Sequence, residues 1–222
     1  NIMLDLIIKN GTVIDGTNKP NFKSDIGIKN SVIKEIGILD NVPAKKIIDA
    51  SNLVVAPGFI DIHTHSDISV INDPYNESKI FQGVTTEVTG NCSYSPFPSG
   101  NDDPNTLKEE LWEKRGNADD PNTIWKWTTF DEYANYIENR GTSLNIAPQV
   151  GYAALQIASG SVENRRATVD ELENMKKLAN ESIEQGAFSL STGLSVPPSA
   201  FASTEEIIEV CKSISHYDNV FY

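Results

Sequence analysis

The chain has 222 residues, of which 39% are hydrophobic and 22% charged, values that suit one or two globular domains with a buried core. Its 31 acidic and 18 basic residues give a formal net charge of -13. Such a surface repels nucleic-acid phosphates and anionic lipid, so we expect neither nucleic acid nor a membrane as a partner. No apolar run approaches the roughly 20 residues of a membrane helix. Two cysteines do not make a disulfide framework and the first residues do not resemble a signal peptide, so we expect a cytoplasmic protein.

Short strands are predicted for residues 1–57. The segment LDLIIKNGTVID places two apolar stretches around Lys9–Gly11, a sequence typical of turns. SDIGIKNSVIKEIG repeats the pattern around Asn30 and Ser31, and KKIIDA adds a further short strand. This spacing predicts a small antiparallel β domain, which we interpret as an incomplete sandwich.

Strands and helices alternate in residues 58–222. The apolar run LVVAPGFIDIHTH predicts a strand buried on both faces, and further strands are expected at VTTEVTG, SLNIAPQVG, AFSLSTG and NVFY. Helices are expected at residues 74–82, 129–139, 168–185 and 203–215. The last three begin with capping boxes, which pair Thr129 with Glu132, Thr168 with Glu171, and Ser203 with Glu206. About four βα units predict a parallel sheet, either doubly wound or the N-terminal half of a (β/α)8 barrel.

The linker at residues 95–128 is longer than ordinary βα connections. It is polar and rich in proline, aspartate and asparagine. Its tryptophans, Trp112, Trp125 and Trp127, are interpreted as local packing anchors rather than a binding platform.

Two histidines follow the first apolar run of this second region. On a strand, residues two apart point to the same face, so His63 and His65 are expected to project together. They fall where the strand ends, which is where barrel enzymes place their active sites. Two imidazoles on one face suit Zn²⁺ or another borderline divalent metal. The alternative is an accidental pair on a polar loop, but the chain has only three histidines in all.

Asp67 and Cys92 are further candidates for the same site. Asp67 either orients a ligand imidazole or contacts substrate, or else it caps a turn or helix, and the residues do not decide between these roles. Cys92 ends a strand-like segment, where a thiolate would bind zinc strongly, although a free cysteine is more often a small buried side chain. Cys211 shares a predicted helix face with core residues, and His216 is expected to cap that helix at its C-terminal end.

Four segments, taken in order, resemble one family. They are DLIIKNGTVIDG, VVAPGFIDIHTHSD, QGVTTEVTGNCSYSPFP and STGLSVPPSAFAS, and they are similar to the D-aminoacylase (N-acyl-D-amino-acid deacylase) branch of the amidohydrolase superfamily. PGFIDIHTHSD indicates only the superfamily, whereas GVTTEVTGNC is more specific, because this branch uses a cysteine where relatives carry a carboxylated lysine. The resemblance implies a TIM barrel and zinc-dependent hydrolysis of an N-acyl-D-amino acid, a small molecule, to a D-amino acid and a carboxylate.

By this resemblance, His63 and His65 bind one metal position and Cys92 binds the other. It also implies that the catalytic residues lie beyond Tyr222, so that residues 1–222 form an N-terminal half whose partner is the missing C-terminal half or a second copy. Two alternatives remain open: a non-catalytic fragment that binds metal or a partner, and a cyclic amidohydrolase of the hydantoinase or dihydroorotase kind. A lysine in AFSLSTG would favour the second, and that segment has none.

The chain departs from the family pattern at three positions near the expected substrate site. Family members often have histidine, arginine and tyrosine where this chain has Tyr152, Gln156 and Val196. We therefore expect substrate contacts that differ from those usual in the family.

Overall fold

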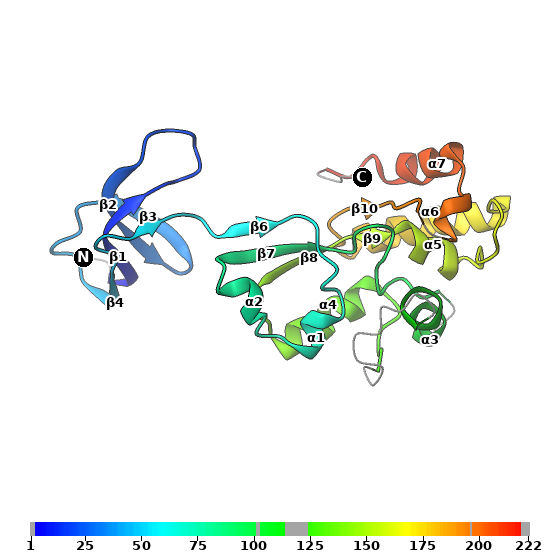
Figure 1. Cartoon of the computed structure of the whole chain (residues 1–222), viewed down its shortest axis with the longest axis horizontal. Helices are drawn as coiled ribbons and strands as arrows, with labels where there is room; N and C mark the ends of the chain where they lie inside the picture. Colours follow the sequence, from blue (N-terminus) through cyan, green and yellow to red (C-terminus); the bar gives the residue numbers. More distant parts are fainter. Residues whose placement is uncertain (1–2, 101–102, 114–123, 196, 219–222) are drawn as a thin grey trace. The chain divides into compact units, whose positions relative to one another are not determined.

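The computed structural model describes residues 3–100, 103–113, 124–195 and 197–218. The chain divides into two compact units, Asn1–Gly58 and Phe59–Tyr222 (Figure 1). Within the described residues, every helix is too short or too polar to cross a bilayer.

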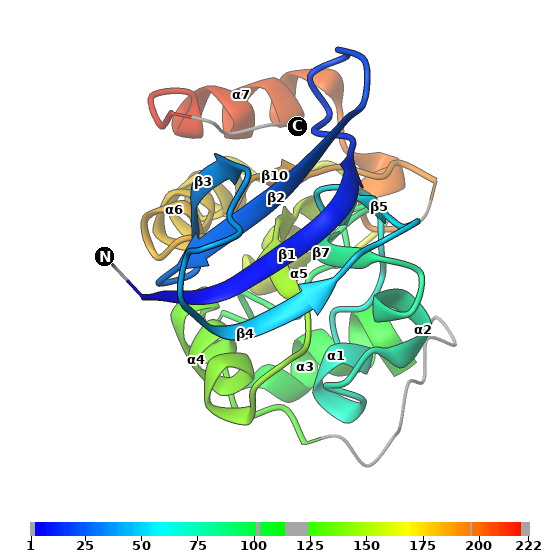
Figure 2. The ribbon, with the colours of Figure 1, turned by 90° about the vertical axis from the view of Figure 1, so that its left-hand side faces the viewer.

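A five-stranded mixed sheet forms the first unit (Figure 2). Its strands are β1 (Leu4–Val13), β2 (Phe22–Lys29), β3 (Val32–Gly37), β4 (Ala44–Asp49) and β5 (Val54–Val55). The predicted antiparallel pairing is confirmed for β1 with β2 and for β2 with β3, but it is wrong for β4 and β5, which pair with β1 in parallel. The reason is the connection after β3, which crosses to the far edge of β1. Leu39 in that connection is buried against Leu4 and Ile7.

The turn predicted at Lys9–Gly11 is instead a bulge inside β1. Asn10 adopts a left-handed φ of 63°, and the register with β2 shifts at this point. The Asn10 N–H donates to the buried carboxylate of Asp25 at 2.8 Å, and the Leu39 N–H donates to the same side chain at 3.0 Å. These bonds lower the pKa of Asp25 and hold the bulge, so the chain continues instead of reversing. The turn predicted at Asn30–Ser31 is confirmed, with φ of 49° and 59°.

Parallel strands alternate with helices in the second unit. The strands are β6 (Phe59–Asp61), β7 (Val84–Thr89), β8 (Asn145–Pro148), β9 (Val150–Gly151) and β10 (Leu190–Ser191). The pairs β6–β7, β7–β8 and β9–β10 are all parallel, and only Gln149 separates β8 from β9. The mixed α/β class is therefore confirmed. The strand predicted at NVFY lies outside the described residues.

Nine helical segments connect or follow these strands. They are α1 (Ser69–Asn72), α2 (Glu77–Ile80), α3 (Pro104–Lys108), the π-helical η1 (Glu109–Glu113), α4 (Phe130–Arg140), α5 (Tyr152–Ala158), α6 (Val169–Glu184), the 3₁₀ helix η2 (Ser199–Phe201) and α7 (Thr204–Ile214), counted over the described ranges. All three predicted capping boxes are confirmed, at the starts of α4, α6 and α7. The helix predicted at residues 74–82 is shorter, because Asn76 has a left-handed φ of 46° and α2 begins only after it.

The core of the second unit is aromatic. Trp112, Trp125 and Trp127 are buried in one cluster, as expected of packing anchors, and the last two stack with ring centroids 5.6 Å apart. The Trp127 indole N–H donates to the Pro96 carbonyl at 2.8 Å, which satisfies its buried polar atom. All three tryptophans lie in the second unit, so their fluorescence reports its unfolding.

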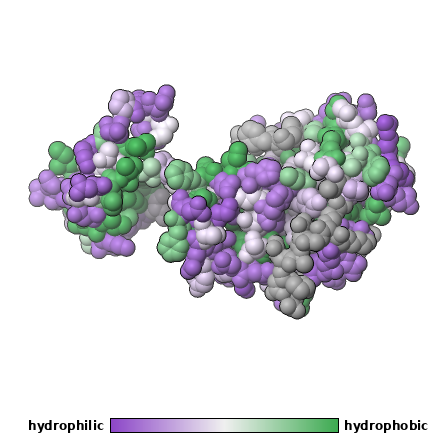
Figure 3. Space-filling view, in the orientation of Figure 1, coloured by the Kyte–Doolittle hydropathy of each residue, from purple (hydrophilic) through white to green (hydrophobic). Residues whose placement is uncertain are grey.

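The apolar run LVVAPGFIDIHTH is not buried on both faces as predicted. It divides into β5 and β6, and Phe59, Ile60 and Ile62 are 63%, 62% and 73% exposed. The reason is that β6 pairs with β7 on one side and with no other described strand. Exposed apolar side chains also gather on the first unit (Figure 3), among them Ile33, Ile47 and Val54.

A bidentate ion pair at the start of α6 makes stability depend on pH. Arg165 donates two bonds of 2.8 Å to the Glu171 carboxylate and lowers the pKa of Glu171 from 4.5 to about 2. The pKa of Glu171 is lower in the folded chain than in the unfolded chain. The stabilisation by this pair is therefore present above pH 4.5 and is lost as the pH falls toward 2.

We therefore expect Glu171→Gln to lower the free energy of unfolding at pH 7 and to change it much less at pH 3. Urea titrations followed by tryptophan fluorescence measure the difference. Glu173→Gln is the control, because that carboxylate makes an exposed pair with Lys176 on the same helix. An equal effect of Glu171→Gln at both pH values would contradict the assignment.

Candidate metal centre

The histidine pair lies just after β6 rather than within it. Pairing of β6 with β7 ends at Asp61, four residues before the end of the predicted strand at His65. The chain nevertheless continues beside β7, because the Thr64 N–H donates to the Val88 carbonyl at 3.1 Å. His63 and His65 are exposed, whereas Thr64 between them is buried. The two imidazoles therefore leave the same short segment on the solvent side.

A sharp turn after β7 presents Cys92. Gly90, Cys92 and Ser93 all have left-handed φ, of 76°, 55° and 73°. Such a conformation is uncommon for residues other than glycine and marks a backbone that its surroundings hold in place. The turn lies at the carboxyl end of β7, and the histidines follow the carboxyl end of β6 beside it. Because β6 and β7 are parallel neighbours, the histidine pair and Cys92 lie at the same edge of the sheet.

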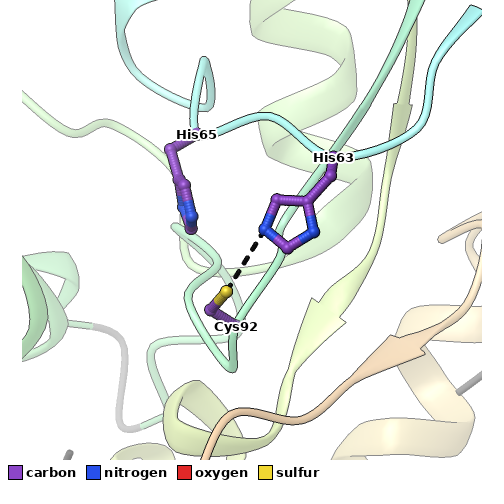
Figure 4. A group of neighbouring side chains, drawn as sticks. All are labelled: His63, His65 and Cys92. Atoms are coloured by element: carbon purple, nitrogen blue, oxygen red, sulfur yellow. Dashed lines mark hydrogen bonds between the residues drawn. The ribbon is translucent and has the colours of Figure 1, made fainter. Parts of the chain in front are cut away.

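The three side chains converge (Figure 4). The Cys92 Sγ lies 3.3 Å from the His63 Nε2, and the rings of His63 and His65 are 5.6 Å apart between centroids. One ligand atom from each residue fits within 4.8 Å of the other two. A tetrahedral zinc ion with Zn–N near 2.0 Å and Zn–S near 2.3 Å separates its N and S ligands by about 3.6 Å. The donor atoms and their spacing thus fit one borderline divalent ion, whereas the resemblance implied two positions, one for the histidines and one for Cys92.

The protonation of His65 also suits metal binding. Partial burial lowers the pKa of His65, and the neighbouring His63 lowers it further. A lowered pKa favours the neutral imidazole, which is the form that ligates metals.

The Cys92 turn packs against Gly151 of β9 and against Gly193, which lies two residues after β10. A Cβ at Gly151 would lie 2.1 Å from the Ser93 carbonyl oxygen, and one at Gly193 would lie 2.6 Å from the Cys92 carbonyl oxygen. Ser93 also accepts a bond of 2.6 Å from the Gly193 N–H. Without a side chain, Gly193 lets the backbone of Cys92 approach closely.

Comparison with known proteins places this chain in a family. The Amidohydro_3 model, described as an amidohydrolase family, matches residues 46–197. The chain belongs to the amidohydrolase family. It is 38% identical to D-aminoacylase of Alcaligenes xylosoxydans xylosoxydans over 98% of this chain and 43% of that protein. This amidohydrolase chain thus spans less than half the length of the relatives that it matches.

Solved structures agree with the sequence comparison. A D-aminoacylase structure, described in connection with a binuclear metal centre, matches with a TM-score of 0.83 and 38% identity over 95% of this chain and 43% of that one. N-acyl-D-glutamate deacylase from Bordetella bronchiseptica, complexed with zinc and a phosphonate inhibitor, matches with a TM-score of 0.84 and 31% identity, covering 96% and 43%. The relatives of this amidohydrolase are metal-dependent enzymes.

Asp67 follows His65 by two residues, and of the roles that the sequence left open for it the structure contradicts only the helix cap. Its carboxylate is fully buried and accepts no hydrogen bond of good geometry, and α1 begins without a side-chain cap. Burial raises the pKa of Asp67 to about 7, against the opposing effect of the Gly90 N–H and the Thr89 hydroxyl. Its backbone carbonyl accepts a bond of 2.6 Å from the Tyr133 hydroxyl.

An ion-pair cluster around Lys79, which includes Asp61 two residues before His63, was not predicted from the sequence. Lys79 of α2 lies 2.7 Å from the Asp61 carboxylate and 3.1 Å from that of Glu87, which is fully buried on β7. The bond to Asp61, followed by Glu87, raises the pKa of Lys79, and Lys79 lowers the pKa of Asp61. The sequence did indicate a buried ion pair, because the glutamate inside the β-branched run VTTEVTG needs a partner if the strand is buried.

We expect Lys79→Met to destabilise the second unit by about 3 kcal/mol, because it leaves the buried Glu87 carboxylate without a cation. Urea unfolding followed by tryptophan fluorescence gives the difference. Lys177→Met is the matched control, since Lys177 makes only an exposed pair of 3.7 Å with Glu181 and its loss should cost under about 0.5 kcal/mol. Equal losses in the two variants would show that Glu87 does not depend on Lys79.

The remaining candidate residues are not part of the cluster of His63, His65 and Cys92. Cys211 packs partly buried against the core, as predicted, and burial raises the pKa of its thiol. His216 is exposed after α7, with its ring 4.0 Å from that of Tyr217. Tyr152 and Gln156 are buried in α5, where Gln156 accepts a bond of 3.0 Å from the Ser199 hydroxyl. Val196 lies outside the described residues.

Proposed function

We propose that this chain supplies the metal-binding part of a zinc-dependent amidohydrolase that converts N-acyl-D-amino acids to D-amino acids and carboxylates. The observation that supports this best is the cluster of His63, His65 and Cys92 in a chain related along nearly its whole length to D-aminoacylase. That extent of similarity favours neither a non-catalytic fragment nor a cyclic amidohydrolase.

We propose zinc as the metal because of the donor set. Two imidazoles with a thiolate are typical of zinc, whereas magnesium and calcium prefer oxygen ligands. When bound, zinc supplies polarisation of the scissile carbonyl and activation of water. His63, His65 and Cys92 hold it, and the exposed position of the histidines leaves the site open to a small substrate. We propose that the buried Asp67, two residues after His65, supports the ligand segment, and we assign no proton-transfer role to any residue here.

We also propose the finer architecture that the sequence suggested. Parallel strands in chain order, with helices between them, support residues 58–222 as the N-terminal part of a (β/α)8 barrel. The apolar surface of the mixed sheet supports residues 1–57 as part of a small β-sandwich domain.

The test is hydrolysis of N-acetyl-D-amino acids and their L enantiomers by the complete protein that contains this chain. We expect release of amino acid from the D forms, loss of activity with a chelator, and recovery with zinc. A polypeptide of residues 1–222 alone should bind zinc without measurable turnover, since a missing proton-transfer group costs about 10²–10⁴-fold in rate. Chelator-resistant activity, or hydrolysis of hydantoins in preference to N-acyl-D-amino acids, would reject the proposal.

A further inference from the structure

Asn91 connects the two segments that carry the proposed ligands. It is buried, 8% exposed, and directly precedes Cys92. Its side-chain nitrogen donates to the Thr64 carbonyl at 3.2 Å and to the Val88 carbonyl at 2.9 Å. Thr64 is the one residue between His63 and His65. A single amide therefore bridges the histidine segment and the cysteine turn, which are far apart in sequence.

The hydrogen bonds at this position call for a side chain that donates twice. Both partners are carbonyl oxygens, which only accept, so the NH₂ end of Asn91 must face them and both of its protons are used. The Val88 carbonyl also receives the Thr64 N–H and the Thr64 hydroxyl, each at 3.1 Å. The Val88 carbonyl therefore joins the end of β7 to both the histidine segment and the cysteine turn.

Packing around the imidazoles fixes them only in part. His63 is exposed, and the ring of His65 makes one edge-on contact with Tyr94, with centroids 6.2 Å apart. Their positions relative to Cys92 depend on the backbone of residues 63–65 and 90–93, and that backbone is what Asn91 joins. We propose that Asn91 is a positioning residue that fixes the separation of the histidine pair from Cys92. This rests on the proposed function, in which the three residues bind one metal site.

The test uses Co²⁺ as a spectroscopic probe in the whole chain. Bound to wild type, it should give a thiolate-to-cobalt charge-transfer absorption from Cys92. Asn91→Ala should bind cobalt and zinc about 10–100-fold more weakly, the range found when a partner that orients metal ligands is removed, and its charge-transfer absorption should weaken. Asn91→Ser should behave alike, because its hydroxyl can bond the Val88 carbonyl locally but is too short to reach Thr64.

Asn180→Ala is the matched control. Its amide also donates two bonds, to the Lys176 carbonyl at 2.7 Å and the Ser213 hydroxyl at 3.2 Å, but it lies on α6. Metal-free unfolding midpoints of all variants separate loss of fold from loss of positioning, and Asn91→Ser supplies the result if Asn91→Ala does not fold.

The possible results are distinct. Weaker binding and a weaker band in the Asn91 variants, with Asn180→Ala unchanged, support the proposal. Unchanged affinity and spectrum in the Asn91 variants, or equal losses in Asn180→Ala, would show that Asn91 only stabilises the fold. A wild-type chain that binds neither cobalt nor zinc would overturn the proposed metal site itself, and the positioning role with it.

Discussion

Replacing both His63 and His65 with alanine should remove zinc from the chain. Loss of an orienting partner alone weakens metal binding about 10–100-fold, so losing two direct ligands should exceed 100-fold. The measurement is zinc content after gel filtration, together with competition against a chromophoric chelator. His216→Ala is the matched control, because His216 is the third histidine of the chain and is exposed outside the cluster. Equal zinc in the double variant and in wild type would remove the histidines from the site.

Zinc should protect Cys92 from alkylation. The thiolate is both the metal ligand and the nucleophile that reacts with iodoacetamide, so occupation of the site competes directly with labelling. We expect saturating zinc to slow labelling of Cys92 by about tenfold or more. Mass spectrometry of tryptic peptides distinguishes it from Cys211, whose raised pKa and partial burial should keep labelling slow with or without zinc.

Two variants make the protection experiment specific. Cys211→Ser leaves Cys92 as the single thiol and should retain full protection. His63→Ala should remove protection without removing the thiol, because the His63 Nε2 lies 3.3 Å from the Cys92 Sγ. Labelling of Cys92 at one rate with and without zinc would return this cysteine to the role of a small packing side chain.

Local rules predicted the helices well and the strand boundaries poorly. Capping boxes at Thr129, Thr168 and Ser203 fix helix starts through bonds within four residues, so the sequence contains the whole signal. The parallel pairing of β4 with β1 depends on residues about forty positions apart, and no local pattern encodes it. Helix α5 was missed because all of its residues are buried, which removes the apolar stripe that marks an amphipathic helix.

Some residues of the candidate site could likewise be predicted from the local sequence, and others could not. His63 and His65 could be found because two ligands lie close in one segment. Cys92 was ambiguous from its own neighbourhood, and only the resemblance raised it, since its nearness to the histidines depends on strand pairing. Asn91 gave no signal, because a buried amide that joins two carbonyls resembles any loop asparagine in the sequence. The charge cluster around Lys79 could have been found from Glu87 alone.

The left-handed backbone at Cys92 limits how this site can change during evolution. Few residues accept a φ near 55°, and among those that do, aspartate and histidine also ligate metals. A carboxylate in place of the thiolate would shift the preference from zinc toward harder ions such as Mn²⁺. Glutamate, which would otherwise serve as well, is disfavoured by the backbone rather than by the metal. The shape of one turn therefore narrows the set of metals and ligands that descendants of this chain can use.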